Sequence, residues 1–204
     1  MTPWEQFERM SLEKIFQPGK KIIDIGGGLR LSRENNNRLS DRNQWVQPLL
    51  AQVDYKVMDK VADYHPDIVG DIHHLPFADN TIDSIICIAV LEHVEEPWIA
   101  AQEMHRVLKT DGTAFVYVPF LYYYHPLKGY YGDFYRYTEE GIGYLFRNFS
   151  SLDLSPVRGA TETVFNLLPK KISRWIWPSA RIIDRLMGKS TSHQTSGFNI
   201  FLTK

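Results

Sequence analysis

Cysteine is almost absent from this sequence. Cys87 is the single one, and it stands in an apolar run typical of a buried strand, so we interpret it as a small core residue and exclude a disulfide framework within one chain. No apolar run reaches the roughly 18 residues that a membrane-spanning helix needs. The acidic N-terminal region, with Glu5, Glu8 and Glu13, does not resemble a signal peptide. We therefore expect a cytoplasmic protein.

An excess of charge of either sign is also lacking. The formal net charge is −1 over 204 residues, so no overall field favours nucleic acid, and we expect no nucleic-acid partner. The length fits one domain over residues 1–204.

Three consecutive glycines follow a short apolar run at residues 21–28. This pattern predicts a buried strand that ends in a turn, where glycine lets the backbone approach a ligand closely. A dinucleotide fingerprint needs a further glycine where Leu31 stands, and no Gly-Lys-Ser/Thr follows for a Walker A loop. Two interpretations stay open: a nucleotide-like cofactor over Gly26, Gly27 and Gly28, or a tight turn without a ligand.

Apolar runs alternate with helical patterns along the rest of the chain. We expect strands at 21–25, 53–58, 67–70, 82–88, 113–118, 151–157 and 197–202, and helices at 3–16, 44–52, 97–108 and 139–148. This alternation predicts a doubly wound α/β sheet. The N-terminal segment 1–19 is interpreted either as a lid or as ordinary packing. The polar segment 29–43 holds four arginines, which either meet an anionic group or are solvated.

Acidic residues follow the second and third expected strands. Asp59 can accept hydrogen bonds from both hydroxyls of a ribose, with a surface turn as the alternative. Asp71 followed by Ile72 can hold an adenine. The adjacent His73 and His74 face different ways in a strand or helix, so we expect no metal site.

These residues form an ordered series that resembles the class I S-adenosylmethionine-dependent methyltransferases. The series covers roughly residues 20–120. Its members are Asp24-Ile25-Gly26-Gly27-Gly28, Asp59, Asp71-Ile72, Leu75-Pro76-Phe77, Leu91-Glu92-His93 and Leu108-Lys109-Thr110-Asp111-Gly112. The chain departs from the family where Arg30 replaces the last glycine of Gly-x-Gly-x-Gly and where the polar segment 29–43 interrupts the usual first helix.

The resemblance implies a Rossmann-like fold and S-adenosylmethionine as the cofactor. The fold is a seven-stranded sheet, mostly parallel with an antiparallel last strand, and helices on both faces. The resemblance also places Asp24 and Gly26–Gly28 against the methionine and ribose part, Asp59 at the ribose hydroxyls, Asp71 and Ile72 at the adenine, and Ala89 beside the cofactor.

The segment 120–138 is the expected acceptor-site loop. Its His-Pro…Asp-x-x-Arg-Tyr-Thr run loosely resembles one found in methyltransferases of bacterial surface-glycan and related small-molecule pathways. We expect His125 to act as general base and Asp133 to orient it, with His93 as the rival base. Arg136 would bind an anionic group of the substrate, unless it forms a structural pair with Asp133. The aromatic substrate-binding candidates are Tyr124, Tyr131 and Tyr137.

A helical insertion is expected at 162–190, before the last strand. Tryptophans and basic residues mix with aliphatic residues over 164–187, a composition that suits a peripheral contact with the inner membrane. A cover for the acceptor pocket and a homodimer surface are the alternatives.

The sequence as a whole predicts an S-adenosylmethionine-dependent methyltransferase that acts on a hydroxyl of a small-molecule or glycan acceptor. A non-catalytic cofactor-binding module with a degenerate glycine loop is the first alternative. A nucleotide-dependent oxidoreductase is the second, and the missing third glycine disfavours it. The Asn/Asp-Pro-Pro-Tyr/Phe motif of base-modifying methyltransferases is absent.

Overall fold

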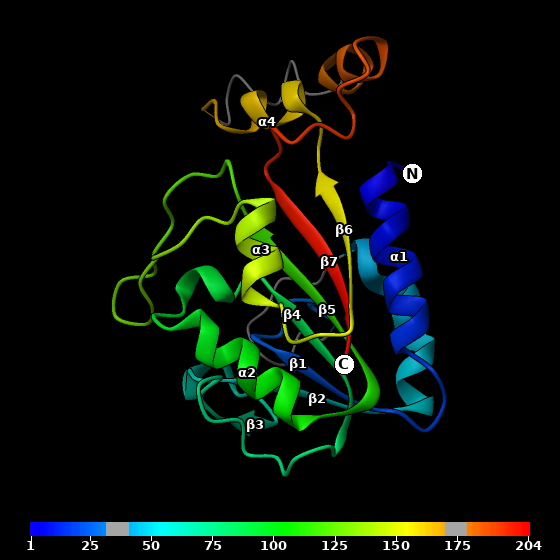
Figure 1. Ribbon diagram of the computed structural model, residues 1–204, viewed down its shortest axis with the longest axis vertical. Helices are drawn as coiled ribbons and strands as arrows, with labels where there is room; N and C mark the ends of the chain where they lie inside the picture. The colour runs from blue at the N-terminus through cyan, green and yellow to red at the C-terminus, as the bar shows by residue number, and fades with distance from the viewer. Residues whose placement is uncertain (32–40, 170–178) are drawn as a thin grey trace.

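One seven-stranded sheet organises the described part of the protein, which a computed structural model gives as residues 1–31, 41–169 and 179–204. The strand order is β3-β2-β1-β4-β5-β7-β6 (Figure 1). The strands are β1 (Lys21–Ile25), β2 (Asp54–Asp59), β3 (Ile68–Val69), β4 (Ile82–Ile88), β5 (Leu108–Pro119), β6 (Ser151–Val157) and β7 (Gly197–Thr203).

The pairing is parallel except at the last strand. β1 runs parallel to β2 and β4, β2 to β3, and β4 to β5, whereas β7 lies antiparallel between β5 and β6. The predicted doubly wound sheet with an antiparallel last strand is confirmed. Because parallel strands present their carboxyl ends at one edge, the turns after β1, β2 and β4 are brought together there.

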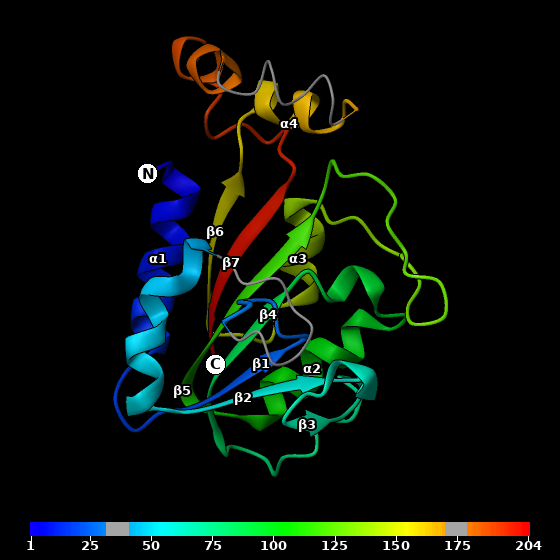
Figure 2. The same ribbon diagram turned by 180° about the vertical axis from the view of Figure 1, so that it is seen from behind.

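Helices cover both faces of the sheet (Figures 1 and 2). Side chains of α2 (Pro97–Val107) and α3 (Glu139–Leu145) join one buried cluster, and those of α1 (Pro3–Ile15) and the 3₁₀ helix η1 (Asp41–Gln52) join the other. Further helical segments among the described residues are the 3₁₀ turns η2 (Ala62–Tyr64) and η3 (Leu91–His93), α4 (Ala160–Asn166) and residues 179–186.

The N-terminal helix packs on the sheet. Its apolar side chains Trp4, Leu12 and Ile15 are buried as the sequence predicts, and a reciprocal capping box between Thr2 and Glu5 begins the helix. None of the residues of α1 lines the large cavity described below. The helix is packed on the sheet, and the lid interpretation stays a prediction.

Several element bounds differ from the expectation. The helix expected at 44–52 is a 3₁₀ helix that contains Pro48, a residue without the N–H that an α-helical ladder uses. β5 begins at Leu108 rather than at 113, because the expected turn at Asp111 and Gly112 becomes an irregularity inside the strand. Asp111 has φ 60° there, and the β4–β5 register shifts beside it. α3 ends at Leu145 rather than at 148.

The insertion before β7 is partly described. The carboxylate of Asp184, on the helical residues 179–186, accepts hydrogen bonds from the backbone N–H groups of Thr161 (2.8 Å) and Glu162 (3.0 Å) at the start of α4. Residues 170–178, with Trp175 and Trp177, lie outside the described residues, as do 32–40 of the polar segment. Among the described residues, the longest apolar helices fall short of a membrane span.

Candidate functional site

The glycine turn after β1 fits a close ligand approach. Gly26 (φ 79°) and Gly27 (φ 59°) have left-handed backbones. A Cβ atom at Gly26 would lie 2.5 Å from Cγ2 of Val90, and one at Gly28 would lie 2.5 Å from Cβ of Ile88. Both positions therefore require glycine.

The buried side chain of Asp24 holds this turn in place through hydrogen bonds. Its carboxylate accepts hydrogen bonds from the N–H groups of Gly28 (3.1 Å) and Leu29 (3.2 Å) and from the hydroxyl of Tyr55 (2.7 Å). Burial raises its pKa to about 6, although these three hydrogen bonds oppose that shift. Asp24 is fully buried and does not line the cavity. In the structure Asp24 therefore positions the turn, and its direct contact with the cofactor stays a prediction.

A cavity of about 390 Å³ opens at the carboxyl ends of β1, β2 and β4, within the size range of small-molecule sites. Except for Asp24, all of the predicted cofactor residues line it. They are Gly26, Gly27, Gly28, Asp59, Asp71, Ile72 and Ala89. Ala89 adopts φ 55° at the end of β4, a strained conformation of the kind that clusters at functional sites.

The two acidic residues of the cavity have different surroundings. Asp59 accepts a hydrogen bond from Val61 N–H (2.8 Å), and burial raises its pKa. Burial alone would also raise the pKa of Asp71, but hydrogen bonds from Lys60 (2.8 Å) and from His73 outweigh it and bring that pKa to about 2. Asp71 is therefore a firmly ionised carboxylate, whereas Asp59 keeps free oxygen capacity toward the cavity.

The predicted acceptor loop, residues 120–138, closes over this cavity. Tyr130 stacks on Tyr64 with the ring centroids 5.8 Å apart, and its hydroxyl donates to Asp63 (3.2 Å). Tyr131 lies 4.4 Å from the His93 ring, centroid to centroid, and both line the cavity. The loop thus connects the edge of the sheet near β2 with the end of β4.

Asp133 and Arg136 hold this loop in place. Arg136 pairs with both oxygens of Asp133 and also donates to the backbone carbonyls of Tyr122, Tyr123 and Tyr135. Asp133 accepts from the N–H of His125 (2.7 Å), and its side chain is fully buried. The hydrogen bonds from Arg136 hold the pKa of Asp133 well below its usual range. The structure therefore contains the structural Asp133–Arg136 pair that the sequence analysis gave as the alternative to substrate binding by Arg136.

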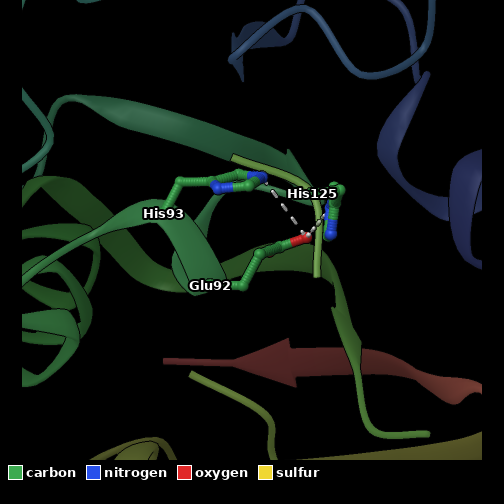
Figure 3. A group of neighbouring side chains, drawn as sticks. All are labelled: Glu92, His93 and His125. Atoms are coloured by element: carbon green, nitrogen blue, oxygen red, sulfur yellow. Dashed lines mark ion pairs between the residues drawn. The ribbon is translucent and has the colours of Figure 1, made fainter. Parts of the chain in front are cut away.

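Glu92, His93 and His125 converge at one point beside the cavity (Figure 3). Glu92 Oε1 lies 3.9 Å from Nε2 of His93 and 3.8 Å from Nε2 of His125. Burial raises the pKa of Glu92 to about 7 and lowers the pKa of His93. His93 and His125, the two candidate general bases, are thus neighbours of Glu92, to which the sequence analysis assigned no role.

Two of the aromatic candidates lie away from the cavity. Tyr137 is buried in the core, and its hydroxyl donates to the carbonyl of Leu91 (2.8 Å). Its placement in the acceptor site is wrong, because the side chain is enclosed by the sheet and the helices. Tyr124 is 74% exposed. Neither residue, nor His125, Asp133 or Arg136, lines the cavity itself.

Comparison with known proteins shows similarity to methyltransferases. Residues 32–116 match a family described as a methyltransferase domain. An uncharacterised protein of Methanocaldococcus jannaschii is 49% identical over 51 residues, which are 25% of this chain and 22% of that protein. The ubiquinone/menaquinone biosynthesis C-methyltransferase UbiE of Haemophilus ducreyi is 30% identical over 107 residues, which are 48% of this chain and 40% of that protein. The chain spans less than half the length of these two relatives.

A solved structure shares the fold across almost the whole chain. The S-adenosylmethionine-dependent methyltransferase of Archaeoglobus fulgidus superposes with a TM-score of 0.60 at 12% identity, covering 98% of this chain and 94% of that one. This chain shares the fold of that methyltransferase, and residues 32–116 resemble the methyltransferase-domain family. The predicted fold is confirmed, and the match to a methyltransferase domain supports the predicted family.

Some residues of this site were given no role at the sequence level. Lys60 and Tyr130 line the cavity, as does Arg30 from the polar segment, and Glu92 joins the histidines. Arg30 stands where the family has glycine and takes the glycine-like φ of 53°. The Leu91-Glu92-His93 motif was the only sequence signal for Glu92. That its side chain is 1% exposed depends on the fold and could not be read from the motif.

Proposed function

We propose that this chain transfers a methyl group from S-adenosylmethionine to a hydroxyl of a small-molecule or glycan acceptor. The observation that carries the proposal is the single cavity wall formed by the glycine turn, Asp59, Asp71 and Ile72. In the reaction the acceptor oxygen forms a bond to the methyl carbon, the carbon–sulfur bond breaks with its electron pair going to sulfur, and the hydroxyl proton passes to a base or to water.

The residues present fit the cofactor. Gly26, Gly27 and Gly28 line the cavity without side chains, so the methionine and ribose part can approach their backbone closely. Asp59 can accept from the ribose hydroxyls, and Asp71 with Ile72 can hold the adenine, a carboxylate beside an apolar side chain. Arg30 supplies a positive charge at the same turn, suited to the cofactor's carboxylate.

The acceptor side is formed by aromatic side chains and polar groups. Tyr131 and Phe134 line the cavity and are partly exposed, which suits the faces of a sugar or another ring. His93 lines the cavity beside them, with Glu92 and His125 behind it. We propose that this cluster handles the acceptor hydroxyl, while the closed loop orients the acceptor and excludes water.

Calorimetric titration of the purified chain with S-adenosylmethionine, S-adenosylhomocysteine and NAD tests the cofactor assignment. We expect micromolar binding of the first two that Asp59→Ala weakens about tenfold or more, because a charge-assisted hydrogen bond contributes roughly 1.5–3 kcal/mol. Asp54→Ala, at the exposed start of the same strand β2, is the matched control and should bind normally. Binding of NAD alone would favour the oxidoreductase alternative.

Transfer to the acceptor is tested with isotope-labelled methyl donor and panels of glycans and small hydroxylated molecules, and the product methyl is located by NMR. A methoxy signal supports the proposal. A methyl on carbon would instead place the chain with the C-methyltransferase UbiE of Haemophilus ducreyi in acceptor chemistry. Cofactor binding without transfer to any acceptor class would favour the non-catalytic module.

We also propose that the segment 164–187 contacts an anionic membrane surface, which would place a cytoplasmic enzyme at the inner membrane. Among its described residues, five large apolar side chains are 46–82% exposed, namely Val164, Leu167, Ile182, Leu186 and Met187. The helices that carry them lie beyond the end of β6 and the start of β7 (Figure 1), at the same edge of the sheet as the cavity but at the other end of the strand order. Apolar side chains with nearby Arg185 and Lys189 suit a lipid interface.

A further inference from the structure

Three atoms that normally bind metal ions meet at the wall of the cavity. Glu92 Oε1 and the Nε2 atoms of His93 and His125 all lie within 4.8 Å of one another (Figure 3). Glu92 and His93 belong to η3, directly after β4, and His125 belongs to the loop after β5. The fold therefore assembles the cluster from two strand ends that are adjacent in the sheet.

Both histidines are held in the tautomer that frees Nε2. Nδ1 of His93 lies 2.6 Å from the carbonyl of Gly132, and Nδ1 of His125 lies 2.9 Å from the carbonyl of Tyr123. A carbonyl only accepts, so each Nδ1 carries the hydrogen, and the neutral ring keeps a lone pair on Nε2. A hydrogen bond from the second ring nitrogen to a backbone carbonyl is the usual support of a metal-binding histidine.

The carboxylate of Glu92 is only partly compensated, by its own backbone N–H and by the charge of Arg136. Its side chain is 1% exposed, and Oε2 is buried without a hydrogen-bond partner. Arg136 is the nearby cation, but each of its five N–H groups is used by Asp133 or by backbone carbonyls. A buried carboxylate with one unsatisfied oxygen is costly, so the site favours a positive charge at this point.

A proton alone does not satisfy the cluster. The oxygen–nitrogen separations of 3.8 and 3.9 Å exceed hydrogen-bond length, and one proton could join only one pair. Around a tetrahedral ion with bonds of about 2.1 Å, ligand atoms lie about 3.4 Å apart. The two oxygen–nitrogen separations need to close by about half an ångström to reach that spacing, and the two Nε2 atoms, which lie within 4.8 Å of each other, by up to about 1.4 Å.

We propose that Glu92, His93 and His125 bind one divalent transition-metal ion of the zinc class. Two imidazoles and one carboxylate suit Zn²⁺, Fe²⁺ or Co²⁺, whereas Mg²⁺ and Ca²⁺ prefer sets of oxygen ligands. Three protein ligands leave a coordination position open, as in catalytic zinc sites. His93 faces the cavity, so the ion lies at the cavity wall.

The role of this ion rests on the proposed function. An acceptor hydroxyl at the open position loses its proton to water more readily, because a bound cation lowers the pKa of an oxygen ligand. The binding site itself rests only on the geometry of the three side chains. Failure of one proposal is therefore separable from failure of the other.

The test uses the full chain without a polyhistidine tag, freed of metal by a chelator and dialysed. Titration with Zn²⁺ by calorimetry and with Co²⁺ by visible absorption should give one equivalent per chain. We expect Glu92→Gln, His93→Ala and His125→Ala each to weaken binding by at least about 100-fold and to abolish the intense cobalt bands. His74→Ala, an exposed histidine outside the cavity lining, is the control and should bind as the parent chain does.

Measurements of folding and of cofactor binding distinguish loss of the metal site from loss of the folded structure. Circular dichroism and titration with S-adenosylhomocysteine identify a variant that has lost its structure, and Glu92→Gln, which keeps the side-chain shape, serves if a histidine variant unfolds. Absence of a stoichiometric site, or affinity unchanged in all three variants, overturns the metal proposal while cofactor binding and turnover stand. Zinc binding without any cofactor binding overturns the proposed function and leaves the metal site.

Discussion

Asp133 and Arg136 form a two-point ion pair, with Oδ1–Nη1 at 2.5 Å and Oδ2–Nη2 at 2.8 Å. The same carboxylate accepts the N–H of His125, and the same guanidinium binds three backbone carbonyls. A planar guanidinium makes these contacts in a fixed fork that an ammonium cannot reproduce. The pair therefore sets the position of His125 and the path of the acceptor loop.

Replacement of Arg136 by Lys should loosen this loop. We expect turnover to fall at least about tenfold, with the free energy of unfolding lowered by about 2 kcal/mol, because several charge-assisted hydrogen bonds are lost. The affinity for S-adenosylhomocysteine should change little, since Arg136 does not line the cavity. Steady-state kinetics, urea unfolding and calorimetry measure the three effects.

Arg147→Lys is the control for that variant, because Arg147 is exposed and its guanidinium donates to the carbonyl of Tyr144. It should keep turnover and stability within measurement error. Normal turnover in Arg136→Lys would show that the ion pair does not position the reacting groups.

Asp24 should make stability depend on pH. Its pKa is about 6 in the folded protein against 3.8 as the reference value, so the native state binds more protons than the unfolded state between these values. The stability contributed by the protonated form is therefore complete below about pH 4 and is lost as the pH rises through 6. A shift of about two pKa units corresponds to at most about 3 kcal/mol.

Urea unfolding of the parent chain and of Asp24→Asn between pH 4 and pH 8 isolates this contribution. The difference in unfolding free energy between the two proteins should change across pH 4–6 and become constant above about pH 7. Other groups that titrate in this range cancel in the difference. A difference that stays flat across the whole range would mean that Asp24 remains ionised at its ordinary pKa.

The sequence predicted the parts of this site that local chemistry determines. Glycines, strand-end carboxylates and the order of motifs placed Gly26–Gly28, Asp59 and Asp71 at one edge of the sheet, and the structure has them there. Tyr137 was misplaced because an aromatic residue in a polar loop gives no sign of its burial. The closeness of His93 and His125 to Glu92 depends on the neighbouring positions of β4 and β5, which no local spacing encodes.

Arg30 takes a left-handed backbone at the position where the family has glycine. A side chain in that region costs roughly 1–2 kcal/mol, so Arg30→Gly should raise the free energy of unfolding by about 1 kcal/mol. The same change removes a positive charge from the cavity, and we expect the affinity for S-adenosylmethionine to fall about tenfold. Thermal unfolding and calorimetry measure the two effects, which have opposite directions.

Asp111→Gly provides the comparison for Arg30→Gly. Asp111 also has a left-handed backbone, with φ 60°, but it lies outside the cavity lining. It should gain similar stability with no change in cofactor affinity. Equal cofactor binding by the parent chain and Arg30→Gly would remove Arg30 from the cofactor site and leave only the backbone effect.

The exposed side chains Ile182 and Leu186 should decide whether the insertion meets a membrane. Replacing both by Ser removes apolar area that would enter the interface, at roughly 25 cal/mol per Å². We expect the parent chain to co-sediment with vesicles that contain anionic lipid at low salt, and the double variant to lose at least about tenfold in partition coefficient. The control is Met10→Ser, at an exposed apolar residue on α1, and it should bind as the parent chain does.

Failure of the parent chain to bind such vesicles would remove the membrane role. If analytical ultracentrifugation instead shows a dimer that the double variant loses, these side chains belong to a homodimer surface.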